Sequence, residues 1–258
     1  MGETPAIEFR NVSYRLPDGR ALLNSVTLEV AMGTTVALLG KSGSGKTTLL
    51  RTVNRMHGVS TGDVLVRGHS IFEQEVIPLR RSIGYVIQET GLFPHFTVER
   101  NIGLVLEIEG RSGAVIAKRV HALLEMVGLD AAGFARRLPH ELSGGQRQRV
   151  GLARALAAGQ DILLMDEPFG ALDPLTRAEM QDVLRRLTLE VQGSGARTTV
   201  LLVTHDLDEA LYLAERVVLI EDGGVAASLP AEQFLSSRVP AVQAYVRAVH
   251  RDAEARSQ

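Results

Sequence analysis

The chain has 258 residues, of which 45% are hydrophobic and 22% charged, and its formal net charge is −2. This balance excludes a disordered chain, because enough apolar side chains are present to build a core, and it provides no general basic field for nucleic acid. Since the chain has no cysteine, it has no disulfide, no zinc thiolate site and no thiol catalysis. No apolar stretch reaches the roughly 18 residues that span a bilayer, so we expect a soluble chain.

The predicted strands are of two kinds. Three early segments alternate polar with apolar residues, as half-buried antiparallel strands do: residues 7–14, 22–30 and 63–67. Five runs are almost continuously apolar, which is typical of parallel strands covered on both faces: residues 36–39, 84–87, 162–165, 200–204 and 217–220. Helical spacing is found at 117–127 and 146–157.

This order predicts an α/β fold with a mainly parallel sheet, helices on both faces and an N-terminal antiparallel β-subdomain. We expect one domain over residues 1–258, with a core from 1–87 and 161–258 and an inserted helical subdomain over 88–160. The glycine-rich stretch 221–224 is expected to be an ordinary surface turn. Near the end, Val242, Tyr245, Val246 and Val249 stand at helical spacing, which predicts a last amphipathic helix.

A phosphate-binding motif follows the first apolar run. The stretch fits G-x-x-x-x-G-K-[ST] between a strand and a helix, the setting that a P-loop requires. Its predicted nucleotide-binding residues are Gly40, Lys41, Ser42, Gly43, Ser44, Gly45, Lys46, Thr47 and Thr48. Lys46 can reach the β- and γ-phosphates and the Thr47 hydroxyl can ligate Mg²⁺, while the helix start adds unpaired N–H groups. The sequence therefore predicts a P-loop NTPase core that binds a nucleoside triphosphate.

Two acids, Asp166 and Glu167, end the apolar run at 162–165. Ligands of open α/β sheets bind at the carboxyl ends of the strands. Asp166 is therefore placed to hold the Mg²⁺ shared with Thr47, and Glu167 to polarise an attacking water. An isolated Asp-Glu pair would indicate a solvated turn, but the preceding strand and the Lys46 motif favour the catalytic interpretation.

A second glycine-rich segment, Leu-Ser-Gly-Gly-Gln at 142–146, begins a helical pattern. Ser143 suits an N-cap, and Gly144 and Gly145 leave backbone N–H groups bare, which makes a second anion site. One nucleotide needs only one phosphate cradle per chain, so this segment is expected to serve the nucleotide of a second subunit. Arg147 and Arg149, further along the helix, are expected on a solvated basic face.

Residues 142–146, including Gln146, resemble the signature motif of ABC-type ATPases, and the whole chain is similar to the nucleotide-binding subunit of an ABC transporter. The resemblance implies that two subunits, as a homodimer, sandwich two ATP molecules with Mg²⁺. Each ATP then lies between one Lys46 loop and the other chain's Ser143 segment. It also implies a place at the cytoplasmic face of the plasma membrane, held through transmembrane permease subunits that receive solute from a binding protein.

Four further positions match the family's motifs one by one. Gln88 resembles the Q-loop glutamine that contacts Mg²⁺ and the attacking water, and His205 the switch histidine that contacts the γ-phosphate. Asp173 resembles the D-loop residue that follows Ala171, although Asp173-Pro174 is also a good helix start. Tyr14 resembles the aromatic residue that stacks on adenine, with packing inside the front sheet as the alternative.

The resemblance places permease docking at residues 88–95 and the helices after them. Apolar Leu92 and Phe93 suit an interface, and the alternative is that both pack inward. The sequence of residues 83–97 and of residues 165–174 resembles that of the quaternary-amine subgroup, which imports glycine betaine, carnitine, choline or proline as osmoprotectants. An exporter, a lipid-handling system and an importer of another small solute stay open as alternatives.

Overall fold

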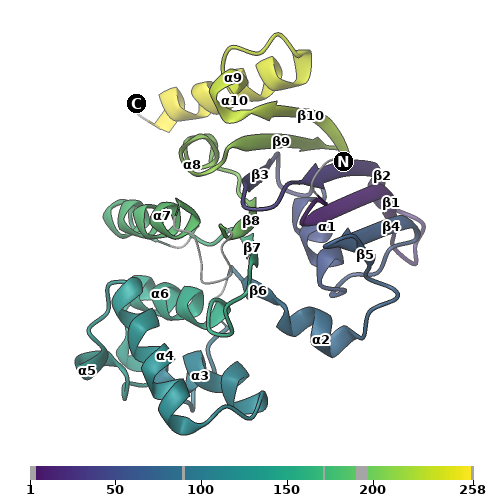
Figure 1. Ribbon diagram of the computed structural model, residues 1–258. Helices are drawn as coiled ribbons and strands as arrows, with labels where there is room; N and C mark the ends of the chain where they lie inside the picture. Colours follow the sequence, from purple (N-terminus) through teal and green to yellow (C-terminus); the bar gives the residue numbers. More distant parts are fainter. Residues whose placement is uncertain (1–3, 89–90, 171, 190–196, 257–258) are drawn as a thin grey trace. The chain divides into compact units, whose positions relative to one another are not determined.

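The computed structural model describes residues 4–88, 91–170, 172–189 and 197–256 (Figure 1). The chain divides into two compact units, and each is described by itself. Unit 1 consists of Met1–Leu79 with Thr199–Gln258, and unit 2 of Arg80–Thr198. The boundaries expected at residues 88 and 160 stay a prediction.

Unit 1 contains an antiparallel front sheet in the order β2-β1-β4-β5. Its strands are β1 (Ile7–Arg15), β2 (Ala21–Val30), β4 (Thr61–Val66) and β5 (His69–Ser70). Ile7 and Phe9 alternate on the core face of β1 and are completely buried, as is Val12, which follows an irregularity in the pairing. The polar-apolar alternation of this region therefore predicted its antiparallel strands correctly.

The second sheet of unit 1 contains the strands β3 (Thr35–Leu39), β8 (Thr199–Val203), β9 (Arg216–Glu221) and β10 (Gly224–Pro230). β3 pairs in parallel with both β8 and β9, while β10 pairs antiparallel with β9. Every residue of β3 and β8 is buried, as their continuous apolar sequence predicts. The helices are α1 (Lys46–Val53), α2 (Val76–Arg81, which ends in unit 2), α8 (Leu207–Leu213), α9 (Ala231–Phe234) and α10 (Pro240–Arg256).

Unit 2 combines two parallel strands, β6 (Ile83–Val86) and β7 (Ile162–Asp166), with a group of helices. The helices are α3 (Val98–Ile108), α4 (Gly113–Met126), α5 (Ala131–Phe134), the 3₁₀ turn η1 (Pro139–Glu141), α6 (Gly144–Ala155) and α7 (Pro174–Leu189). α3 to α6 form one bundle in Figure 1. The expected helical insertion is present. Its helices α4 and α6 begin earlier than the apolar spacing indicated, α6 because the Ser143 side chain caps it and α4 directly after Ser112, whose side chain makes no capping bond.

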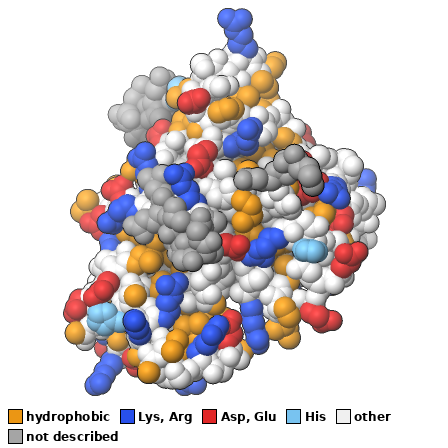
Figure 2. Space-filling view, in the orientation of Figure 1, with side chains coloured by type: hydrophobic (Ala, Val, Ile, Leu, Met, Phe, Trp, Pro, Cys, Tyr) orange, Lys and Arg blue, Asp and Glu red, His pale blue; other side chains and the backbone are white. Residues whose placement is uncertain are grey.

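The surface carries both signs of charge. On the face drawn in Figure 2, acidic and basic side chains are interspersed, in agreement with the net charge of −2. Within the described ranges, none of the helices has the length and apolar character needed to cross a membrane.

Candidate functional site

In unit 1 the phosphate loop, residues 40–45, joins the buried strand β3 to helix α1. Two of its glycines are required by close backbone contacts. A Cβ atom at Gly40 (φ 151°) would lie 2.3 Å from the carbonyl oxygen of Ile220, and one at Gly45 (φ 102°) would lie 2.6 Å from that of Leu22. Any side chain at either position would displace the loop or a neighbouring strand, so the loop is fitted closely to its own unit.

The hairpin turn between β9 and β10 holds the phosphate loop through hydrogen bonds. The amide of Gly223 donates to the carbonyl of Ser44 at 3.1 Å, and the Gly223 carbonyl accepts from the Asn24 amide at 2.9 Å. Asn24 also donates from its side chain to the carbonyl of Asp222 at 2.7 Å. Gly223 is buried, so the expectation of an ordinary surface turn at 221–224 was wrong for this residue: its backbone joins the loop to β2.

Lys46 lies inside the loop, with only 5% of its surface exposed. Its ammonium donates to the carbonyl oxygens of Gly40 and Lys41, both at 2.8 Å. Thr47 and Thr48 follow in the first turn of α1, which contains no acidic side chain. Within the described residues, the buried Ser44 hydroxyl has no hydrogen-bond partner. A buried ammonium, an unpaired hydroxyl and a helix start fit the phosphate groups of a nucleotide.

Two other predicted residues lie in unit 1. His205 is exposed in the connection from β8 to α8. The next residue, Asp206, caps α8 by accepting from the Glu209 amide at 3.1 Å, so the helix-start role belongs to Asp206. Tyr14, near the end of β1, is half-buried, with its ring centroid 5.8 Å from that of His57. Burial, together with Arg51, lowers the pKa of His57. Tyr14 is therefore packed beside His57 and is also partly exposed.

The two acids lie in unit 2, at the end of β7. Asp166 is the last residue of the strand and is 3% exposed. Glu167 has a φ of 45°, which is uncommon for a residue with a side chain and is shared in this chain by residues such as Asn11 and Asp222. Its carboxylate accepts from the Gln88 amide at 3.5 Å. The fold therefore brings Gln88 and Glu167 together, although 79 residues separate them.

The sequence analysis did not identify one polar residue that lies next to these acids. Gln148, on α6, is 5% exposed, and its side-chain amide donates to the carbonyl oxygen of Pro168, directly after Glu167. A polar side chain on the buried face of a helix was the available signal, because Gln148 stands one turn before buried Leu152. Gln148 therefore ties α6 to the turn that positions the acids.

The segment at the start of α6 is capped as the sequence predicts. The Ser143 hydroxyl accepts from the Gln146 amide at 3.2 Å, and the Gln146 side chain accepts from the Ser143 amide at 2.9 Å. Ser143 and Gly144 are exposed. A Cβ atom at Gly144 would meet no atom of the described residues within 4 Å, whereas one at Gly145 would lie 2.3 Å from the Thr176 methyl group.

The expected solvated basic face of α6 was wrong. Arg147 donates to the carbonyl of Leu142 at 2.7 Å, and Arg149 to the carbonyl of Val127 at 2.9 Å. Arg149 also pairs with Glu179. Both guanidinium groups are therefore used within the unit, because their long side chains reach back to carbonyl groups at the ends of other segments.

Asp173 lies just before α7, and its carboxylate accepts from the Thr176 amide at 3.1 Å. Hydrogen bonds from Thr176 lower the pKa of Asp173. The helix-start interpretation of Asp173 is therefore present in the structure, and it leaves the D-loop interpretation open. Ala171, its neighbour in the predicted motif, lies outside the described residues.

The predicted docking loop is held by one buried amide. Residues 89 and 90 lie outside the described part of the chain. Asn101, with no exposed surface, accepts from the Phe93 amide at 2.8 Å and donates to the carbonyls of Phe93, Phe96 and Thr97. Phe93 is 41% exposed and Leu92 is half-buried. Inward packing is thus excluded for Phe93, which is presented at the surface of a fixed loop.

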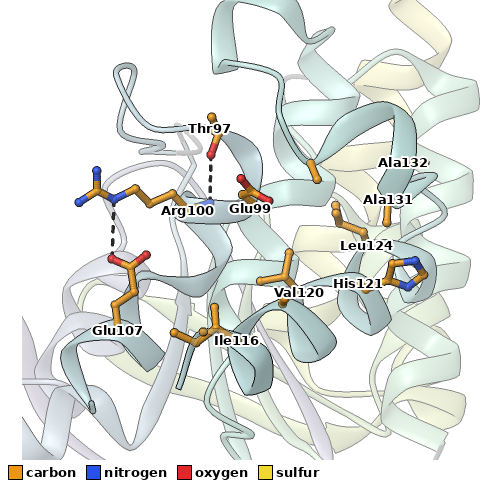
Figure 3. Close-up of a pocket in the computed structure, with 13 residues that line it drawn as sticks. Thr97, Glu99, Arg100, Glu107, Ile116, Val120, His121, Leu124, Ala131 and Ala132 are labelled. Atoms are coloured by element: carbon orange, nitrogen blue, oxygen red, sulfur yellow. Dashed lines mark hydrogen bonds and ion pairs between the residues drawn. The ribbon is translucent and has the colours of Figure 1, made fainter. Parts of the chain in front are cut away.

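Beside this loop, α3, α4 and α5 enclose a cavity of about 560 Å³ (Figure 3). Its apolar lining includes Ile116, Val120 and Leu124. On its rim, Arg100 pairs with Glu107 at 3.7 Å and lies over the Phe96 ring, 4.1 Å from the ring centroid. The loop at 92–97 meets the cavity at Thr97, which lines it, and at Arg100, which lies over Phe96. We call this loop and the cavity together the docking surface, after the predicted role.

Comparison with known proteins gives a family and several relatives. A family model described as ABC transporter matches residues 23–170. A choline transport ATP-binding protein of Bacillus subtilis (strain 168) is 42% identical over 219 residues, which cover 85% of this chain and 56% of that protein. A glycine betaine uptake system ATP-binding protein of Escherichia coli (strain K12) is 45% identical over 219 residues, with 85% and 69% covered.

A sulfate/thiosulfate import ATP-binding protein of Nocardia farcinica is 47% identical over 205 residues, covering 80% of this chain and 59% of that protein. Among solved structures, a dimeric ATP-binding cassette in a post-hydrolysis state, bound to ADP and Pi, has a TM-score of 0.77 and 34% identity, with 87% of this chain and 98% of that chain covered. This likeness confirms the predicted α/β P-loop fold. The chain spans only 56% of the length of the choline relative.

Proposed function

The chain belongs to the ABC transporter family, whose model matches more than half of it, and we propose that it is the ATP-hydrolysing subunit of an importer. The observation that carries this proposal is Lys46, an ammonium buried inside a glycine loop, where it donates to the carbonyl oxygens of Gly40 and Lys41. In this role the ammonium would exchange those carbonyls for the β- and γ-phosphates, which are better partners for a buried cation.

The remaining roles follow from the chemistry of each side chain. Thr47 and Asp166 would hold Mg²⁺, which neutralises charge on the phosphates when bound. Within the described residues, no group of three or more acidic or histidine side chains could hold a metal ion. Mg²⁺ usually takes only one or two protein ligands together with water and phosphate oxygens, so one hydroxyl and one carboxylate would be enough to hold it.

The chain's own catalytic groups would act by position and charge. Glu167 would accept a proton from the attacking water, with Gln88 orienting the carboxylate through the contact at 3.5 Å. His205 would contact the γ-phosphate, and Tyr14 would stack on adenine. These groups need to be held in place before the reaction, and the left-handed backbone at Glu167 is a local sign of such restraint.

The Ser143 segment would bind the nucleotide of a second copy of the chain. Ser143 and Gly144 are exposed, and the space around Gly144 is open among the described residues. The dimeric cassette among the structural relatives supports this arrangement. We infer a homodimer in which each active site takes residues from both subunits.

The docking surface would bind a permease at the cytoplasmic face of the membrane. Exposed Phe93 and the apolar cavity lined by Ile116, Val120 and Leu124 suit an amphipathic segment of a membrane protein. The chain would therefore be attached to the membrane through its permease, and a binding protein would act on it only indirectly.

For the cargo we propose a quaternary-amine osmoprotectant. The sequence of residues 83–97 resembles that of the quaternary-amine importer subgroup, and two relatives are named for choline and glycine betaine. A second candidate is an inorganic anion, since a sulfate/thiosulfate relative is equally similar.

The test is reconstitution in liposomes with a permease and a binding protein of the importer class proposed here. We expect ATP hydrolysis to rise when glycine betaine is added with the binding protein, and labelled betaine to accumulate on the side away from that protein. Stimulation by sulfate alone would leave the importer assignment standing and would contradict the osmoprotectant cargo. Absence of any ATP hydrolysis by the wild-type chain would contradict the proposed activity itself.

A pair of variants tests the docking surface in the same assay. Phe93→Asp should uncouple hydrolysis from transport, because a charge in an apolar interface lowers affinity for the partner. Phe72→Asp is the matched control, since Phe72 is also exposed, at 50%, but lies in unit 1. Equal uncoupling by both variants would contradict the docking role of this surface. Loss of basal hydrolysis in Phe93→Asp would contradict it as well.

A further inference from the structure

Helix α10 lies beside the phosphate loop, and the proposed function gives it no role. A cavity of about 340 Å³ separates them within unit 1. It is lined by residues 40–44 of the loop, by residues 219–222 of β9 and the following turn, and by Ala244 and Tyr245 of α10. The chain's last described helix therefore forms one wall of the space next to the loop.

Tyr245 joins this wall to the switch histidine. Its hydroxyl donates to the carbonyl oxygen of His205 at 3.3 Å, while its ring packs against a buried cluster that includes Leu39 and Leu207. Burial, with the Asp206 carboxylate nearby, raises the pKa of Tyr245 to about 12. The phenol is therefore a neutral hydrogen-bond donor throughout the physiological pH range.

His205 needs such support because of its location. It is exposed in the short connection between β8 and α8, where a side chain keeps more conformational freedom than inside a strand or helix. On one side the backbone is held by the Thr204 amide, which donates to the Leu38 carbonyl at 3.2 Å, and on the other by the cap at Asp206. The Tyr245 hydroxyl holds the peptide at His205 itself.

We propose that Tyr245 is a positioning residue for ATP hydrolysis: by bonding the His205 carbonyl while lining the phosphate loop, it fixes the switch histidine relative to that loop. This proposal rests on the proposed function. Catalytic groups must be held close to their productive geometry, and packed supporting residues supply that restraint. Helix α10 thus contributes to turnover without contacting the nucleotide.

The test compares Tyr245→Phe with Val249→Ala. Phenylalanine keeps the ring and removes only the hydroxyl. Val249 packs against the same buried cluster but does not line the cavity. We expect Tyr245→Phe to lower kcat roughly threefold to tenfold, the change that loss of one hydrogen bond produces, with ATP affinity within about twofold of wild type because the loop is unchanged. Val249→Ala should lower Tm and leave kcat unchanged.

A second measurement needs no nucleotide. The NMR signal of the His205 imidazole, assigned with His205→Gln, should shift in Tyr245→Phe and stay in place in Val249→Ala. Wild-type kcat in Tyr245→Phe, an unshifted His205 signal or an equal loss of kcat in Val249→Ala would each overturn the proposal. Lack of hydrolysis by the wild-type chain would instead overturn the proposed function, and the imidazole signal would still decide whether Tyr245 restrains His205.

Discussion

The two glycine-rich segments, residues 40–45 and 143–145, differ in what surrounds them. Backbone atoms of unit 1 press on the first segment, so that Gly40 and Gly45 leave no room for a Cβ atom. In the second segment Gly145 meets the Thr176 methyl group, but nothing described within 4 Å excludes a side chain at Gly144. The fold itself explains the glycines of the first segment and leaves Gly144 unexplained.

This difference is what the proposed dimer predicts, because the first segment is enclosed by its own unit and the second would meet the partner's nucleotide. Glycine in a helix costs up to about 1 kcal/mol relative to alanine, so an unneeded glycine at the start of α6 lowers helix stability without an internal gain. A close approach from another molecule would supply the reason. In the proposed dimer, that molecule is the partner's nucleotide.

The largest expected effect comes from Glu167→Gln. This variant removes the base from the reaction in which both glycine-rich segments would hold the nucleotide. Turnover should fall by a factor on the order of 10²–10⁴ with loss of the base, while ATP binding persists and the protein accumulates as a dimer. Glutamine has the same size and meets the same backbone strain at φ 45°, so stability should be unchanged. Gel filtration with ATP measures the dimer. A normal turnover rate would move the catalytic role to another residue, such as His205.

Gly144→Asp tests whether the open segment meets a phosphate. A carboxylate about 4 Å from a phosphate charge costs about 4 kcal/mol at an effective dielectric constant of 20, or roughly 10³-fold, so hydrolysis and ATP-driven pairing should be lost. Aspartate is favourable at the first position of a helix, so the fold should persist. ATP binding by the monomer should be unaffected.

Gly144→Ala separates the charge effect from the steric effect: a methyl group at the place where the nucleotide approaches should lower hydrolysis and pairing, but by less than the carboxylate does. Monomer ATP affinity is measured by calorimetry and pairing by gel filtration. If Gly144→Asp weakened monomer binding as much as hydrolysis, the second segment would belong to the same subunit's site, and the contrast between the two segments would disappear.

Lys46→Ala tests the enclosed segment. Removal of the ammonium should weaken ATP binding by roughly 10²-fold, the value of one strong hydrogen bond to a charged group. Lys41→Ala is the matched control, because it removes the same charge from an exposed side chain of the same loop, and its affinity should stay within about threefold of wild type. Calorimetric titration with ATP measures both. Wild-type affinity in Lys46→Ala would contradict the P-loop assignment.

Local sequence patterns were sufficient to predict the strands and the motifs. They were insufficient to predict the long-range hydrogen bonds that hold these motifs in place. Apolar runs predicted β3 and β8, and the cap chemistry at Ser143 followed from residue types alone. The hairpin behind the phosphate loop could not be predicted, because Asn24 and Asp222 are 198 residues apart. Gln148 and Tyr245 likewise act on backbone carbonyls, which every residue has and which therefore leave no mark in the sequence.

The smallest expected effect is on stability, and it tests the comparison without any nucleotide. At Gly45, alanine must adopt a φ of 102° with its Cβ atom 2.6 Å from the Leu22 carbonyl oxygen, so Gly45→Ala should lower the free energy of unfolding by about 1–3 kcal/mol. At Gly144, alanine meets open space and has the better helix propensity, so Gly144→Ala should raise stability by up to about 1 kcal/mol. Urea unfolding of both variants measures the two shifts. Midpoints that move in the same direction would mean that the two segments are equally enclosed, and Gly144 would then be explained by the fold of this chain alone.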